Sequence, residues 1–148
     1  MLRPVNRSDV RFLRDMLRHA YHWRLSEDAE RPVYRYVRNW GRPGDAGVIA
    51  LEGPHAYGAA WYRLFTADEP GFGFVDEQTP ELTIAVVPSR RGKGAGAELL
   101  KALLDQARAD GYAAVSLSAA KGQTEFYERY GFETVREAPH AVTMLARL

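Results

Sequence analysis

The chain has 148 residues, 46% of them hydrophobic and 26% charged, which predicts one globular domain over residues 1–148 and excludes extended disorder. It carries 20 Lys and Arg against 19 Asp and Glu, and this balance argues against a protein dedicated to nucleic acid. The absence of cysteine excludes disulfides, thiolate metal sites and a cysteine nucleophile. Because no apolar run reaches membrane-spanning length and the start MLRPVNRSDV is polar, we expect no membrane partner and a soluble, cytoplasmic protein.

The first half of the chain predicts two helices followed by two strands. Apolar residues recur at helical spacing over residues 8–21 and, more weakly, over residues 28–40. Glycines and a proline at 41–44 then interrupt the chain. Strands are predicted over residues 48–51 and 56–66, with a turn between them.

The second half predicts a strand–helix–strand unit and three further elements. Residues 81–87 (ELTIAVV) are rich in β-branched side chains, and residues 94–109 place five apolar residues on one helical face. With a strand at 113–118, this unit predicts a right-handed crossover between parallel strands. A short helix and two strands follow at 123–129, 132–136 and 141–145. The order predicts an α/β fold with a central mixed sheet and helices on its faces.

The turn over residues 88–96 (PSRRGKGAG) joins the strongest strand to the strongest helix. Its three alternating glycines allow the backbone to approach a ligand, and the start of the helix offers free N–H groups and a partial positive charge. The basic side chains in the turn are Arg90, Arg91 and Lys93. Together these features indicate an anion site, most naturally for phosphate.

Two common phosphate motifs fit this turn poorly. A Walker A loop requires Ser or Thr after its lysine, but Lys93 is followed by Gly94. A dinucleotide fingerprint is matched by Gly92, Gly94 and Ala97, but four residues separate the strand from the first glycine, and the next strand offers no acidic residue for a ribose. A nicotinamide or flavin enzyme stays as an alternative that predicts no response to coenzyme A.

Arg91, Gly94 and Gly96, after a strand ending in V-x-P and before a leucine-rich helix, resemble the R-x-x-G-x-[G/A] motif of the GNAT acyltransferase family. About 30 residues later, the segment 125–132 (EFYERYGF) resembles the F/L-Y-E-x-x-G-F ending of that family. The resemblance covers about residues 80–135. It implies a GNAT-like acyl-CoA N-acyltransferase fold, whose mixed sheet is mostly antiparallel.

The resemblance implies acetyl-CoA as co-substrate. No metal is expected, because His19 and His22 stand three residues apart without an HExxH motif or an acidic third ligand. In the family, the glycine-rich turn binds the pyrophosphate through backbone N–H groups, and the pantetheine arm pairs with a splayed central strand. On this sequence the residues implied for the cofactor are Ile84, Val86, Val87, Arg91, Gly92, Lys93, Gly94, Ala95, Gly96 and Phe126.

The resemblance also implies catalytic roles. Tyr127 matches the tyrosine that serves the thioester sulfur as an acid, and Glu81 stands where family members often place a glutamate that handles the acceptor's proton. Another carboxylate, such as Asp76 or Glu77, or a water stays open as the base. Oxyanion donors are expected among the backbone N–H groups of residues 84–87. Where the family often has Asn, seven residues before the tyrosine, this chain has Ala120.

The acceptor site is expected to involve the first two helices and the strand at 56–66, with Trp23, Trp61 and Arg63 as candidate substrate-binding residues. Aromatic rings there could hold an apolar body or a cation. We therefore expect an N-acetyltransferase that transfers the acetyl group directly to a primary amine of a small molecule or peptide. The alternative is a module that binds or senses acyl-CoA without turnover. The sequence leaves the acceptor and the oligomeric state open, although homodimers are common in the family.

Overall fold

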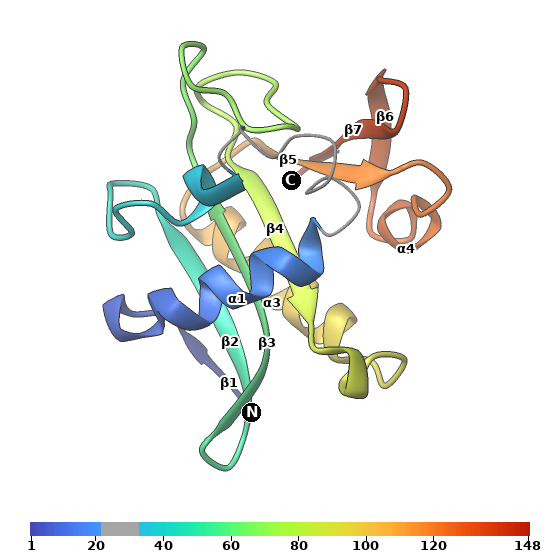
Figure 1. The fold of residues 1–148 in the computed structure, drawn as a ribbon. Coiled ribbons are helices and arrows are strands. Elements are labelled where there is room, and N and C mark those ends of the chain that lie inside the picture. Colours follow the sequence, from blue (N-terminus) through green and yellow to red (C-terminus); the bar gives the residue numbers. More distant parts are fainter. Residues whose placement is uncertain (22–32) are drawn as a thin grey trace.

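One mixed sheet of seven strands forms the centre of the computed structural model, which describes residues 1–21 and 33–148 (Figure 1). The strands are β1 (Leu2–Pro4), β2 (Ala46–Glu52), β3 (His55–Arg63), β4 (Glu81–Val86), β5 (Ala114–Ala120), β6 (Phe132–Glu137) and β7 (Ala141–Arg147). Their spatial order is β1-β2-β3-β4-β5-β7-β6. Every neighbouring pair is antiparallel except β4 and β5, which are parallel, so the predicted mixed, mostly antiparallel sheet is confirmed.

Helices cover both faces of this sheet. In Figure 1, α1 (Val10–Ala20) lies in front of β2–β4 and α3 (Ala95–Ala109) lies behind them. The α-helices are α1 (Val10–Ala20), α3 (Ala95–Ala109) and α4 (Glu125–Glu128), and the 3₁₀ helices are η1 (Arg7–Asp9), η2 (Val33–Tyr36) and η3 (Pro88–Arg90). Each long helix has its own core: Leu13 and Leu17 pack with Trp61 on one face, and Leu99 and Leu103 pack on the other. Alternate residues of the central strands supply both cores, because successive strand side chains point to opposite faces.

The structure differs from the sequence prediction in two elements. In place of a helix over residues 28–40, the described part forms only the short η2, and residues 28–32 lie outside the described residues. Val33, Tyr36 and Val37 are buried at helical spacing, so a single turn accounts for the pattern. Strand β1 was not predicted, because three residues are too few to show alternation.

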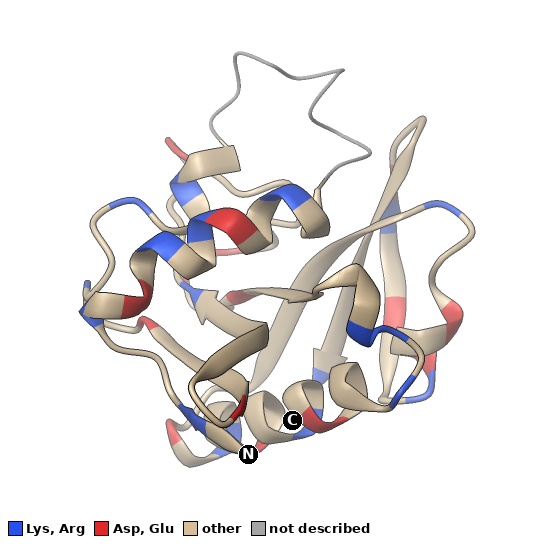
Figure 2. Ribbon diagram, turned by 60° about the horizontal axis from the view of Figure 1, so that its bottom comes forward, with Lys and Arg blue, Asp and Glu red and all other residues tan. Residues whose placement is uncertain are grey.

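Charged residues are interspersed along the described chain and do not gather on one face (Figure 2). None of the helices in residues 1–21 and 33–148 combines the length and apolar character needed to cross a membrane.

A buried ion pair ties the segment after η2 to β3. Arg63 is fully buried, and its Nε and Nη2 donate to the Asp45 carboxylate at 2.9 and 2.6 Å. Its Nη1 donates to the carbonyls of Arg35 and Arg38 at 3.0 and 2.7 Å. Asp45 is itself buried, with 3% of its side chain exposed. The guanidinium therefore neutralises a buried carboxylate and joins three separate stretches of backbone.

Asp45→Ala should lower the free energy of unfolding by about 3–5 kcal/mol, because it leaves the buried Arg63 charge without its carboxylate. Urea unfolding measures this loss. Glu69→Gln is the matched control, since the Arg38–Glu69 pair is exposed and its removal should cost less than about 1 kcal/mol. Equal small losses in both variants would contradict a structural role for Arg63.

Candidate functional site

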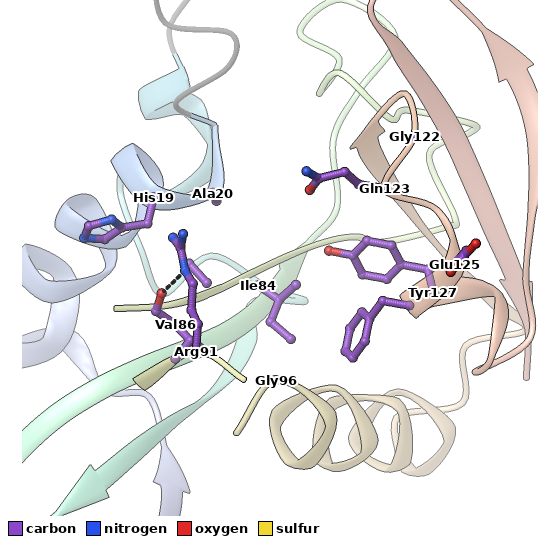
Figure 3. Close-up of a pocket in the computed structure, with 12 residues that line it drawn as sticks. His19, Ala20, Ile84, Val86, Arg91, Gly96, Gly122, Gln123, Glu125 and Tyr127 are labelled. Carbon is purple, nitrogen blue, oxygen red and sulfur yellow. Dashed lines mark hydrogen bonds between the residues drawn. The ribbon is translucent and has the colours of Figure 1, made fainter. Parts of the chain in front are cut away.

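A cavity of about 610 Å³ lies over β4, between α1 on one side and α4 on the other. Strand β4 contributes residues 84–86, the turn before α3 contributes Arg91, and the first turn of α3 contributes Gly96. His19 and Arg91 lie on one side of the cavity, and Gln123 and Tyr127 lie on the other (Figure 3). The sequence prediction missed His19 and Gln123, because neither stands in a motif and only the packing of α1 and α4 brings them to the cavity.

The floor of the cavity is an open strand edge. Strands β3 and β4 pair from Arg63↔Glu81 to Gly58↔Val86, whereas β4 and β5 pair only at Glu81↔Ser116. Beyond that position β4 and β5 diverge. The predicted strand–helix–strand unit with parallel strands is thus confirmed, and its two strands are splayed.

Backbone alternation shows which groups face the opening. The N–H of Val87 donates to the carbonyl of Tyr57 at 2.9 Å, so odd-numbered residues of β4 turn their polar groups toward β3. The N–H groups of Ile84 and Val86 therefore point into the opening. The Val86 carbonyl accepts from Arg91 Nε at 3.0 Å, which places the Arg91 side chain along the cavity. Of the backbone N–H groups of residues 84–87 that were expected as oxyanion donors, those of Ile84 and Val86 face the opening. Those of Ala85 and Val87 face β3, and Val87 does not line the cavity.

The glycine-rich turn has the backbone geometry that only glycine adopts easily. Gly92 and Gly94 have φ angles of 79° and 85°, in the left-handed region. Gly94 is the N-cap of α3 and supplies no side-chain cap, so the first N–H groups of this helix stay available to a ligand. A Cβ built on Gly94 would meet no atom within 4 Å, so the space outside it is open. The turn can therefore hold an anion at the start of α3.

The other residues predicted for the cofactor divide into two groups. Ile84, Val86, Arg91, Gly96 and Phe126 line the cavity. Gly92, Lys93, Gly94 and Ala95 form the turn beside it, and Lys93 and Ala95 border a separate depression next to Tyr57.

Tyr127 reaches into the cavity from α4. Its hydroxyl points toward the region of Ile84, and its ring packs edge-on against Phe126 and Phe132 (Figure 3). Burial raises the pKa of Tyr127 to about 12. The phenol therefore keeps its proton at neutral pH and can act as a hydrogen-bond donor or an acid.

Glu81 lies deeper than expected. It is 1% exposed and does not line the cavity, and the Tyr36 hydroxyl donates to its Oε2. A Cβ on Gly71 would lie 2.2 Å from Glu81 Oε1, so the loop backbone rests directly on the carboxylate. The two other carboxylates considered as bases are engaged in the loop, since Asp76 accepts from Gln78 N and Glu77 from Ala67 N, both at 2.9 Å.

The candidate acceptor residues do not meet at the cavity. Trp61 and Arg63 are buried, and neither lines it. Trp61 Nε1 donates to the carbonyl of Tyr36 at 3.0 Å, and Arg63 holds Asp45, so both side chains join η2 and the following chain to β3. Trp23 lies outside the described residues. Within residues 1–21 and 33–148, no three His, Asp or Glu side chains gather as a metal site would require.

Comparison with known proteins relates this chain to one family. The model of the acetyltransferase (GNAT) family matches residues 10–132. Ribosomal-protein-alanine N-acetyltransferase from Brucella melitensis has a similar structure (TM-score 0.71, 20% identity, covering 100% of this chain and 99% of that chain). The structure of paia N-acetyltransferase from Thermoplasma acidophilum in complex with coenzyme A is also similar (TM-score 0.70, 14% identity, covering 100% of this chain and 98% of that chain). A third similar structure is yncA from Salmonella typhimurium with its cofactor acetyl-CoA (TM-score 0.70, 18% identity, covering 100% of this chain and 93% of that chain).

A search of curated proteins finds no matching sequence. At these identities the solved structures show a shared fold, whereas the family match extends over most of the chain. The protein therefore belongs to the GNAT acetyltransferase family.

Proposed function

We propose that this protein is an N-acetyltransferase that transfers the acetyl group of acetyl-CoA directly to a primary amine. The observation that carries the proposal is the open edge of β4 beside the start of α3, with the Tyr127 hydroxyl facing it. Two similar structures hold coenzyme A or acetyl-CoA, which supports the same ligand here. The acceptor is a small-molecule or peptide amine.

The site offers a separate contact for each end of the co-substrate. The N–H groups at the start of α3, reached over Gly94 and Gly96, suit the pyrophosphate. An extended pantetheine arm can pair with Ile84 and Val86 as a ligand strand does at a sheet edge. Gly96 leaves this path narrow but open, since a Cβ there would lie 3.6 Å from the Phe126 ring.

Acyl transfer at this position uses groups that face the opening. As the amine nitrogen attacks the thioester carbon, negative charge develops on the carbonyl oxygen. The N–H groups of β4 can stabilise that charge. The C–S bond then breaks, and Tyr127 gives its proton to the leaving thiolate.

Gly94→Val should abolish tight coenzyme A binding, because the added side chain fills the space through which a ligand approaches the turn. Calorimetric titration with coenzyme A measures this loss. Gly111→Val is the matched control, since Gly111 at the other end of α3 has a φ angle of 86° and the same open surroundings. Both variants carry similar backbone strain, so equal affinities would contradict a ligand site at the turn.

Tyr127→Phe should lower kcat by about 100-fold while the Kd for acetyl-CoA stays nearly unchanged, because only the proton donor is removed. The measurement is coenzyme A release with a panel of amines: a peptide with a free N-terminus, Nα-acetyl-lysine, spermidine and an aminoglycoside. Tyr130→Phe is the control, since this nearby tyrosine does not line the cavity. An unchanged kcat in Tyr127→Phe would contradict the acid role.

The depth of Glu81 favours one other function, a module that binds acyl-CoA without turnover, because neither Glu81, Asp76 nor Glu77 lines the cavity, whereas Glu125 on α4 does. The same panel separates the two functions. Coenzyme A release with any amine supports the enzyme, and binding without release from any of them supports the module.

A further inference from the structure

A small cavity lined by arginines lies apart from the candidate site. It has a volume of about 50 Å³ and lies between the η2 region and the loop that follows β3. Its lining includes three arginines of the first segment and three residues of the second: Arg35, Arg38, Arg42, Leu64, Phe65 and Glu69. Among the described residues, none lines both this cavity and the large one over β4, so the two are separate.

The buried Arg63–Asp45 pair fixes the backbone from which the three arginines extend. Arg63 Nη1 donates to the backbone carbonyls of Arg35 and Arg38, which stand three residues apart and so project to the same side of a helical turn. Asp45 Oδ2 accepts from the backbone N–H of Arg42 at 2.9 Å. One buried ion pair therefore brings three arginine side chains to one place.

The loop after β3 supplies the opposite wall. The backbone N–H of Glu69 donates to Thr66 Oγ1 at 3.2 Å, and the Glu69 carboxylate accepts from Arg38 Nη2 at 2.7 Å. Arg35 donates to the carbonyl of Pro70 in the same loop. Glu69 is the one acidic side chain among the described residues that line this cavity, and the pair that it forms with Arg38 is exposed.

Positive charge at this cavity exceeds negative charge. Three arginines and one carboxylate line it, which leaves an excess of two, while the Asp45 carboxylate beneath is already neutralised by Arg63. In the described part of the chain, the Arg42 guanidinium donates to no residue. Burial and the nearby charge of Arg63 lower the pKa of Arg42, as expected where cations lie close together. An anion at this cavity would relieve that repulsion.

A phosphoryl group fits both the charge and the space. A guanidinium presents its N–H groups in a planar fork that binds carboxylate or phosphate oxygens in pairs. A water molecule requires about 10–15 Å³ of such space, so the cavity has room for a group of about four atoms besides hydrogen. A phosphoryl group has one phosphorus and three terminal oxygens, and it carries about −1.5 to −2 charge at neutral pH. A carboxylate is smaller and carries a single charge.

We propose that Arg35, Arg38 and Arg42 form a binding site for a phosphoryl group, either as inorganic phosphate or as the phosphomonoester of a small molecule. The Arg42 fork and the N–H groups of Arg38 that Glu69 leaves unused hold its oxygens. The ligand joins the η2 region to the loop that leads into β4. Binding therefore stabilises the folded protein, and it does not depend on the proposed acetyltransferase function.

The test follows the melting temperature against the concentration of inorganic phosphate, with sodium chloride keeping the ionic strength constant. Wild type is compared with Arg42→Gln and Glu69→Gln, two exposed positions whose side chains the fold does not require. Arg108→Gln is the matched control, because this exposed arginine on α3 pairs with Asp105 and does not line the cavity. Gly94→Val separates this site from the turn before α3, which also suits an anion.

Phosphate should raise the melting temperature of wild type, because a ligand of the folded state shifts the unfolding equilibrium. Arg42→Gln should weaken the apparent affinity for phosphate by about tenfold or more, since it removes a charged fork that holds the anion. Glu69→Gln should strengthen the affinity by about threefold or more, because no carboxylate then competes for Arg38 or repels the anion. A purely structural role of these residues would not produce that gain.

Arg108→Gln and Gly94→Val should respond to phosphate as wild type does. Three results would overturn the proposal. The first is a wild-type melting temperature that phosphate raises no more than chloride does. The second is a wild-type response in Arg42→Gln. The third is complete loss of the response in Gly94→Val, which would assign the phosphate to the turn before α3.

Glycerol phosphate and acetate complete the comparison and identify the ligand class. A response to glycerol phosphate that Arg42→Gln removes supports a phosphorylated small molecule as the ligand, whereas such a response to inorganic phosphate alone supports the free ion. Acetate should bind more weakly than either, because it brings one negative charge to a site with an excess of two. Acetate binding as tight as that of phosphate would overturn the assignment to a phosphoryl group.

Discussion

The separation of β4 from β5 is the constraint on which the rest of the site depends. Strands in a sheet satisfy their backbone groups on both sides, yet these two pair only at Glu81↔Ser116. The loop before β4 lies directly against the β5 backbone, since a Cβ on Gly73 would lie 2.5 Å from the carbonyl carbon of Leu117. Farther along β4 the gap stays open and leaves the N–H groups of Ile84 and Val86 for a ligand. The open edge of β4 is thus the result of an incomplete sheet.

The opening has two chemically different ends, one at the start of α3 and the other at α4. The start of α3 offers backbone N–H groups and a partial positive charge, which suit an anion. The other end, at α4, is lined by the aromatic rings of Phe126 and Tyr127 together with the polar Gln123 and Glu125. The proposed function uses both ends, the first for the pyrophosphate of acetyl-CoA and the second for the thioester and the amine.

The parts of the structure that could be predicted from sequence are those that local patterns encode. The β-branched run of β4, the leucine face of α3 and the glycines between them predict their elements because each depends on neighbours along the chain. Strand β1 was not predicted, because three residues are too few to show an alternation of apolar and polar side chains. The length of the helix at η2 was overestimated, because apolar residues such as Tyr36 and Val37 stand at a spacing that a longer helix would also show.

In the candidate site, only residues that belong to a sequence motif could be predicted to line the cavity. Arg91 in the turn, Gly96 at the start of α3 and Tyr127 on α4 each stand in a sequence motif, and all three line one cavity. The depth of Glu81 depends on Gly71 resting on its carboxylate and on a hydroxyl donated by Tyr36, and both contacts join segments far apart in sequence. For the same reason Trp61 and Arg63 could not be separated from acceptor residues until their buried partners were seen.

The most direct measurement of the central claim is the melting temperature of the purified protein with acetyl-CoA, coenzyme A, ATP and NAD in parallel. A ligand that binds only the folded state at a hundredfold excess over its Kd stabilises it by about 2.7 kcal/mol. For a domain of this size, acetyl-CoA and coenzyme A should therefore raise the melting temperature by several degrees, while NAD leaves it unchanged. No shift with coenzyme A, or a shift with NAD alone, would contradict a coenzyme A site between β4 and β5.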